Sequence, residues 1–337
     1  MLFKLKPSVH ITKGKYRDLL CEVQTQYVSF IPQSLTKFLK QYDGKIDLEI
    51  IETQYKATEY YDAYKEYMDY LKNNKLLIFT SENKSVQKIK FEYVEKSTFN
   101  TIIIYIDFKC DHISYEIYRD IIQKYDIISL ELRLLNLDDI DKYLNFTTLL
   151  NTTNVSSIHL VDLQNCLCKD TCESILEKCM KTIKITKFEC DSERTETVQN
   201  KFGAYQITYK TNNILDTRLN VKVDNSHANL RFISEAQVRN VYFNGKIVIA
   251  YDGKFFNDEF MEGKSFGHIS DSNISSDNIG SKFDVWKISK GVIEKCKDCE
   301  LRNLCIDRRI PKLKENGGYY YDSDCGYDLE KGQWIQI

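Results

Sequence analysis

The sequence predicts an α/β protein of three successive segments, and two observations carry that prediction. Four apolar strands in the middle of the chain begin 27, 28 and 26 residues apart, with amphipathic stretches between them. Before this repeat the pattern is of short strands followed by helices, and after it tight-turn signals lead into clustered cysteines. We therefore expect segments at residues 1–90, 91–235 and 236–337.

The first segment reads as three short strands followed by three helices and a closing strand. The expected strands are 9–11, 19–23 and Tyr27–Ile31; the helices begin at Pro32, at Asp47 and at Tyr61; and the last strand is 75–80. Proline suits the start of a helix because its missing N–H has no partner there in any case. In the third helix Tyr61, Tyr64, Met68 and Leu71 recur at helical spacing. This order is that of a winged helix.

The middle segment predicts a mainly parallel sheet. Its expected strands are Thr101–Asp107, 128–134, 156–163 and 182–188, and the helices between them are 115–125, 137–150 and 169–180. Parallel neighbours need a crossover of a dozen or more residues, which this period supplies. Only about four βα units fit before residue 200, so the sequence predicts a partial barrel.

The last segment begins with two turn signals, Asn244-Gly245 and Asp252-Gly253, between apolar runs, which predict β-hairpins. A helix is expected over residues 281–294. It leads into Cys296, Cys299 and Cys305, with Cys325 further along the chain. These four thiols at such spacing predict a metal site with either zinc or an iron-sulfur cluster, since both accept four thiolates.

A second group of cysteines has a simpler interpretation. Cys166, Cys168, Cys172 and Cys179 could form another metal site, but the last three have the spacing of one helix face. We expect buried thiols on that face rather than ligands.

Composition excludes some functions. Lysine plus arginine (47) nearly balances aspartate plus glutamate (49), so the chain as a whole has no net positive charge that would attract nucleic acid. Its longest apolar stretch, residues 101–106, is far shorter than the roughly 20 residues of a membrane helix. We expect no membrane partner, a cytoplasmic location and reduced cysteines.

The hairpins, the Ser265-Phe266-Gly267-His268-Ile269 run, the Cys-x2-Cys-x5-Cys array and Cys325-Gly326-Tyr327 resemble a SPASM domain. The array looks like that of the SPASM-domain peptide maturase of "grasp-with-spasm" systems. The first segment is similar to the PqqD-like domain that recognises leader peptides, and the middle looks like a degenerate radical SAM barrel. The resemblance favours a 4Fe-4S cluster over zinc, and it implies two partners: a precursor peptide and an ATP-grasp ligase that makes ester or amide crosslinks.

Two departures from the family pattern limit what the resemblance implies. A full SPASM domain has a further cysteine where this chain has Arg309, so one cluster site is expected here. Radical SAM enzymes hold their catalytic cluster with Cys-x3-Cys-x2-Cys after the first barrel strand, and this chain offers only Cys110 there. We therefore predict no radical SAM chemistry and assign no catalytic residue.

The winged-helix segment supplies the expected peptide site. An edge strand can accept a peptide as an additional strand, with side chains of a nearby helix giving specificity. The expected residues are Tyr27, Val28, Ser29, Phe30 and Ile31 of the strand and Tyr64, Lys65, Tyr67, Met68 and Leu71 of the helix.

The function expected from these features is that of an accessory maturation factor. It would bind the leader of a ribosomally synthesised precursor and present the precursor to the ligase. Two alternatives stay open: an iron-sulfur metalloenzyme that modifies the peptide itself, and a zinc-stabilised interaction protein unrelated to peptides.

Overall fold

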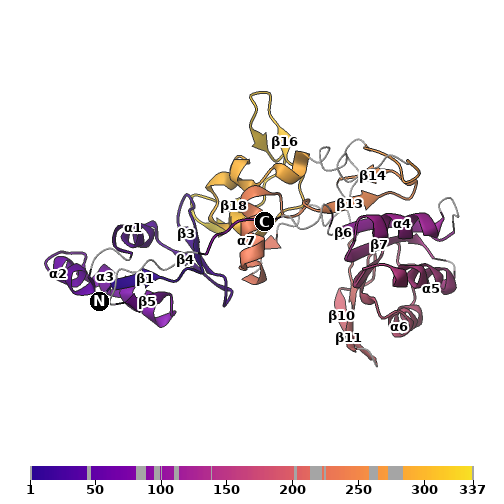
Figure 1. Cartoon of the computed structure of the whole chain (residues 1–337), viewed down its shortest axis with the longest axis horizontal. Coiled ribbons are helices and arrows are strands. Elements are labelled where there is room, and N and C mark those ends of the chain that lie inside the picture. Colours follow the sequence, from indigo (N-terminus) through magenta and orange to yellow (C-terminus); the bar gives the residue numbers. More distant parts are fainter. Residues whose placement is uncertain are drawn as a thin grey trace.

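The computed structural model describes residues 2–43, 47–80, 89–94, 99, 101–109, 114–137, 139–200, 203–212, 222–223, 225–257, 265–271 and 284–335. Cys110 lies outside the described residues. Figure 1 shows the C-terminal segment, in yellow, between the indigo N-terminal module and the magenta strands and helices of the large sheet. Among the described residues, no helix is both long and apolar enough to cross a membrane.

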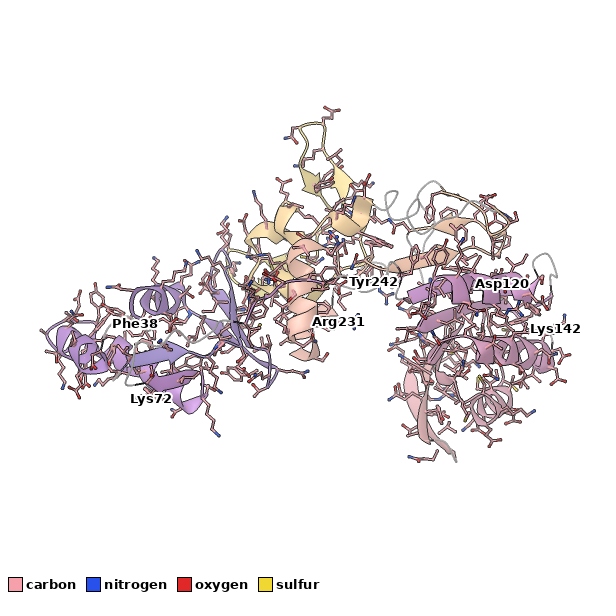
Figure 2. The ribbon with its side chains drawn as sticks, in the orientation of Figure 1. Phe38, Lys72, Asp120, Lys142, Arg231 and Tyr242 are labelled. Carbon is pink, nitrogen blue, oxygen red and sulfur yellow. The ribbon has the colours of Figure 1, made fainter. Side chains whose placement is uncertain are left out.

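The N-terminal module, residues 2–80, contains the strands and helices predicted for it. They are β2 (Val9–Thr12), β3 (Asp18–Glu22), β4 (Tyr27–Ile31), α1 (Gln33–Tyr42), α2 (Leu48–Lys56), α3 (Tyr61–Asn73) and β5 (Leu77–Thr80). The strands β2, β3 and β4 form an antiparallel sheet in that order. A strand that the sequence did not predict, β1 (Leu2–Leu5), pairs antiparallel with β5. Phe38, labelled in Figure 2, lies in the helical core of this module and stacks on Phe3 with 5.9 Å between ring centroids.

The central strand β3 is buried on both faces. Leu20 packs into the core made with the helices α1 to α3. Leu19, Cys21 and Val23 face the other way and share a separate core with residues of the C-terminal segment, among them Leu301 and Leu304. The three-stranded sheet therefore contributes one face to each of two cores. The second core joins the N-terminal module to the cysteine-bearing part of the chain.

The middle of the chain forms an eight-stranded, mostly parallel sheet with the order β10-β11-β9-β8-β7-β6-β13-β14. The βα repeat is confirmed: β6 (Thr101–Asp107), α4 (Tyr115–Lys124), β7 (Ser129–Asn136), α5 (Ile140–Leu149), β8 (Ser157–Asp162), α6 (Lys169–Lys178) and β9 (Thr182–Lys187). Two antiparallel strands follow, β10 (Arg194–Asn200) and β11 (Gly203–Tyr209). This mixed α/β arrangement with a mainly parallel sheet agrees with a partial barrel.

Local sequence explains where the crossover helices begin. The side chains of Ser114 and Asp139 accept hydrogen bonds from backbone N–H groups two residues later, and so cap α4 and α5. Alternate residues of β6 and β7 then pack against these helices in one core, for example Ile102 and Leu130 with Ile122. The strands thus present the same face to all three crossover helices.

The expected hairpins are partly correct. The Asp252-Gly253 turn joins β13 (Lys246–Ile249) to β14 (Phe255–Phe256), and Gly253 has a positive φ of 82°. The Asn244-Gly245 pair also lies in a turn, but residues 241–243 form no strand. β13 therefore forms no hairpin across the Asn244-Gly245 turn. It runs parallel to β6 instead and extends the large sheet. That pairing joins residues about 145 positions apart, which a local pattern does not encode.

The helix expected over 281–294 is wrong for its described part, and residues 281–283 lie outside that part. Two short 3-10 helices, η4 (Asp284–Lys287) and η5 (Lys290–Val292), stand there instead. Ser289 separates them with an extended backbone (ψ 159°). Gly291 and the β-branched residues around it give a continuous α-helix little support, and the buried Trp286 and Ile293 hold the segment in place.

Short elements build the rest of the C-terminal segment. They are η6 (Cys296–Asp298), η7 (Glu300–Asn303), β15 (Cys305–Ile306), β16 (Lys312–Leu313), β17 (Tyr319–Tyr320), β18 (Tyr327–Asp328) and β19 (Gln333–Trp334), together with β12 (Lys222–Val223) and α7 (Leu230–Val238), which begin before residue 236. Ile233 of α7 packs in the core shared with β3. Tyr242, labelled in Figure 2, belongs instead to the core of the large sheet, and the guanidinium of Arg308 lies 5.5 Å from its ring centroid.

Candidate metal centre and adjoining peptide surface

The four C-terminal cysteines line one pocket of about 30 Å³. Cys296 begins η6, Cys299 lies between η6 and η7, Cys305 begins β15, and Cys325 precedes β18. All four are free thiols. The residue before Cys296, Lys295, has an uncommon positive φ of 66°.

A buried group of charges lies beside these thiols. Arg309 and Asp307 form a two-pronged pair, with 2.9 Å from Nε to Oδ1 and 2.5 Å from the second amino group to Oδ2. Lys290 is only 5% exposed, and its Nζ lies 3.6 Å from Asp307 and 3.4 Å from the hydroxyl of Tyr321. Two cations against one carboxylate leave a net positive charge at the pocket. Thiolates around a metal ion would compensate that charge.

Burial sets the protonation of the thiols. It raises the pKa of Cys296 to about 11 and that of Cys305 to about 12, while Lys290 opposes both shifts. Burial also raises the pKa of Cys299. Burial would lower the pKa of Lys290, but neighbours that include Cys305 raise it above its ordinary value. Cys296, Cys299 and Cys305 are therefore protonated at neutral pH in this arrangement, beside the charged Lys290.

The donor chemistry of the pocket fits a thiophilic metal, because four sulfur atoms and no competing carboxylate other than the paired Asp307 line it. Among the described residues, however, no three His, Cys, Asp or Glu side chains already stand close enough to hold a metal ion. Ligation would therefore require the sulfurs to lose their protons and approach one another. Arg309 lines the same pocket.

The second group of cysteines is only partly as predicted. Cys172 and Cys179 are buried, in agreement with a buried helix face. Cys168 is exposed, so its assignment to that face is wrong: it is the N-cap of α6, and its sulfur accepts a hydrogen bond from the N–H of Thr171. Cys166 is exposed as well and bonds to Asp162.

The residues expected to bind a peptide divide into two groups. In the described part of the sheet β4 pairs only with β3, so its other edge has no partner strand. Phe30 is 42% exposed, and Lys65 and Tyr67 are exposed or half-buried on α3. By contrast, three of the expected helix residues belong to the core of the module: Tyr64, Met68 and Leu71. Of the expected α3 residues, only Lys65 and Tyr67 have surface to offer a peptide.

Contacts between the N-terminal module and the cysteine segment are the feature that sequence reasoning missed. Asn303 donates to the hydroxyl of Thr12 (3.0 Å), the N–H of Lys15 donates to the carbonyl of Asp298 (2.8 Å), and Arg302 donates to the carbonyl of Lys13. One signal was present in the sequence. The run Leu19-Leu20-Cys21 has no polar alternation, which is typical of a strand buried on both faces.

The large sheet carries a separate polar network on the face turned away from the crossover helices. Arg133, which is 2% exposed, donates to Glu131 (2.6 Å) and to the hydroxyl of Tyr105 (2.6 Å). His159 lies 3.5 Å from Glu131 and 2.9 Å from the hydroxyl of Thr186. Every member has a partner within the network, so the arrangement satisfies buried polar groups.

No protein-family model matches the chain, and no curated protein sequence matches it. Among solved structures it is similar to SuiB of Streptococcus suis, with 9% identity, coverage of 90% of this chain and 94% of that chain, and a TM-score of 0.33. SuiB bound to S-adenosylmethionine and SuiB bound to the precursor peptide SuiA match with TM-scores of 0.26 and 0.25, each at 9% identity over 90% of this chain and 95% of that chain.

Proposed function

We propose that this chain is an accessory maturation factor for a ribosomally synthesised peptide. It holds the leader of a precursor on the N-terminal module and presents the precursor to an ATP-grasp ligase that forms ester or amide crosslinks. The ligase then carries out the modification. This agrees with the sequence, which has only Cys110 where radical SAM enzymes have the three cysteines that hold their catalytic cluster.

The observation that carries the proposal is the shared core between β3 and the cysteine segment. One face of β3 packs with Leu301 and Leu304, which lie in the chain between the candidate ligands Cys299 and Cys305. The next strand, β4, has an unpaired edge among the described strands and so can accept an extended peptide. A leader docked there would lie on the same small sheet that the metal-binding segment supports.

The candidate metal centre has a structural role in this proposal. Cys296, Cys299, Cys305 and Cys325 would hold a 4Fe-4S cluster, with zinc as the alternative. A centre with four protein ligands is closed to substrate, so it would supply stability or electron transfer. Lys290 and Arg309 supply positive charge beside the ligated thiolates.

The peptide site is tested with the full-length, metal-loaded protein and a labelled leader peptide encoded beside its gene, by fluorescence anisotropy. Proline removes one backbone donor, and alternate residues of an edge strand direct their N–H groups outward. Of Val28→Pro and Ser29→Pro, one should therefore weaken binding at least tenfold more than the other. Equal affinity for wild type and both variants, or no binding to wild type, would refute the proposal.

A further inference from the structure

The strand at the proposed peptide edge, β4, turns one face toward the candidate metal centre. In its antiparallel pairing with β3, Val28 lies opposite Cys21, and Phe30 lies opposite Leu19. Opposite residues of paired strands point to the same face of a sheet, and Leu19 and Cys21 face the cysteine segment. Val28 and Phe30 therefore point toward the cysteine segment, which Figure 1 shows next to β3 and β4.

Val28 and two of the candidate ligands pack against the same apolar core. The core that joins β3 to the cysteine segment is bordered by partly buried residues, and Val28, Cys299 and Cys325 are among them. Because the side chains of a core are close-packed, a displacement of either sulfur changes the packing that holds Val28. The peptide edge and the candidate metal centre are therefore in contact with one core.

Arg17 connects the same two places through polar contacts. The central carbon of its guanidinium lies 3.4 Å from the centroid of the Phe30 ring. The same guanidinium donates to the carboxylate of Glu300 at 3.2 Å and to the hydroxyl of Tyr327 at 3.4 Å. Each of these two partners lies within two residues of a candidate ligand. The cation that covers Phe30 is thus held by groups that move with the ligands.

Metal binding acts on both connections. Among the described residues, no three potential ligand side chains already stand close enough to hold an ion, so Cys299 and Cys325 must approach the other two sulfurs when a metal binds. A ligand shifts an equilibrium only by the difference between its interactions with two states. Here the metal-free and metal-bound states differ in the packing behind Val28 and in the positions of the groups that hold Arg17.

We propose that metal binding at the four cysteines sets the affinity of the β4 edge for the leader peptide, with Arg17 as the positioning residue that couples the two sites. The inference rests on the peptide site proposed above. Without metal, ligation does not fix the partners of Arg17, and the leader must order the edge at a cost to its own affinity. By linkage, the bound leader raises the affinity for metal by the same factor. Metal-loaded chains therefore collect the precursor in preference to metal-free chains.

A thermodynamic cycle with the full-length protein measures the coupling. The fluorescein-labelled leader encoded beside the gene is titrated into zinc-loaded and metal-free protein and followed by anisotropy. The zinc-loaded protein should bind at least about fivefold more tightly, which is the lower end of the usual range for coupled sites. Zinc affinity, measured by competition with a chromophoric chelator, should rise by the same factor when the leader is saturating.

Phe30→Leu and Phe79→Leu are a matched pair of variants. The two rings are 42% and 43% exposed, and Phe79 lies on β5, away from the core shared with the cysteine segment. Phe30→Leu removes the ring under the guanidinium. It should lower the ratio of the two leader affinities about two- to fivefold, the range for one exposed cation–π contact. Phe79→Leu should keep the wild-type ratio.

Arg17→Gln tests the positioning residue itself. Glutamine can keep one hydrogen bond to Glu300, but it loses the charge over Phe30 and the second donor to Tyr327. The ratio of leader affinities should fall at least as far as in Phe30→Leu. Because the ratio compares two states of one variant, a change in leader affinity common to both states does not enter it.

Amide hydrogen exchange gives a readout that needs no peptide. Zinc should slow the exchange of β4 amides, because the core and the guanidinium behind that strand become fixed. The amides of β5 are the internal control: Leu77 of that strand packs against the helical core instead, so their exchange should not change. In Phe30→Leu the zinc-dependent protection of β4 should be smaller than in wild type.

The possible failures separate this inference from the proposed function. Leader binding of equal affinity with and without zinc would refute the coupling and leave the peptide site standing. An equal fall of the ratio in Phe30→Leu and Phe79→Leu would remove Arg17 from the coupling, and equal slowing of exchange in β4 and β5 would mean general stabilisation by the metal. No leader binding in either state would refute the peptide site and this inference with it.

Discussion

Arg17 of the N-terminal module donates from Nε to Oε1 of Glu300 at 3.2 Å, and Glu300 is fully buried next to the candidate ligand Cys299. Tyr327, two residues after Cys325, donates its hydroxyl to the same oxygen at 2.6 Å. The Arg17 guanidinium also lies 3.4 Å from the ring centroid of Phe30 on β4. One side chain therefore joins the proposed peptide edge to residues that neighbour two candidate ligands.

Replacing Arg17 should destabilise the protein and loosen that edge. Arg17→Ala leaves the buried Glu300 carboxylate with only the Tyr327 hydroxyl, since its Oε2 has no partner among the described residues. We expect a loss of about 2–3 kcal/mol, below the full cost of breaking a buried pair because Arg17 is partly exposed. Urea unfolding measures this. Lys15→Ala, which breaks an exposed pair with Glu330, is the control and should change nothing measurable.

The two faces of β3 make a matched pair of predictions. Leu19→Ala and Leu20→Ala should each cost about 2–5 kcal/mol, because both residues are fully buried. Leu19 faces the cysteine segment and Leu20 faces the helices, so only Leu19→Ala should speed the loss of metal to a chelator. Equal rates of metal loss in the two variants would mean that the shared core does not support the metal centre.

Metal affinity should rise with pH. Burial raises the pKa of Cys296 to about 11 and of Cys305 to about 12, and in an unfolded metal-free segment the ordinary thiol pKa of about 8.5 also lies above neutral pH, so in either state the sulfurs carry protons that they must release to bind. Each proton released gives up to a tenfold gain in apparent affinity per pH unit. Zinc titrations of the metal-free protein between pH 6.5 and 8.5, with a pH indicator for released protons, should show at least that dependence. An affinity independent of pH would contradict ligation by these thiols.

No radical chemistry is expected on S-adenosylmethionine. Radical SAM enzymes need three thiolates to hold their catalytic cluster, and at the position expected from the sequence resemblance this chain offers Cys110 alone. Reduced, metal-loaded protein given S-adenosylmethionine should form no 5'-deoxyadenosine above a protein-free blank in chromatography. Turnover in excess of the blank would show that other residues hold a catalytic cluster.

The sequence predicted features whose signals are local. The βα repeat was readable because each strand is a short apolar run and each crossover helix begins at or near a polar cap such as Ser114 or Asp139. The convergence of Cys296, Cys299 and Cys305 on one pocket likewise follows from close spacing.

Features set by distant partners were not predictable in the same way. The parallel pairing of β13 with β6 and the Arg17–Glu300 contact each join segments more than 140 residues apart. The exposure of Cys168 was missed because helical spacing does not reveal which residue becomes the N-cap. The short 3-10 helices around Ser289 were missed because apolar spacing alone suggested a longer helix.

The most direct test of the account is the metal content of anaerobically isolated protein, measured by elemental analysis together with acid-labile sulfide. Wild type and Cys172→Ala, whose cysteine is buried in the core of the large sheet, should each carry one metal centre per chain. Cys299→Ala should carry none, and its C-terminal segment should unfold, because a thiolate site contributes about 10–16 kcal/mol against a typical stability of about 5–15 kcal/mol. Unchanged metal content in Cys299→Ala would contradict the assignment of the centre.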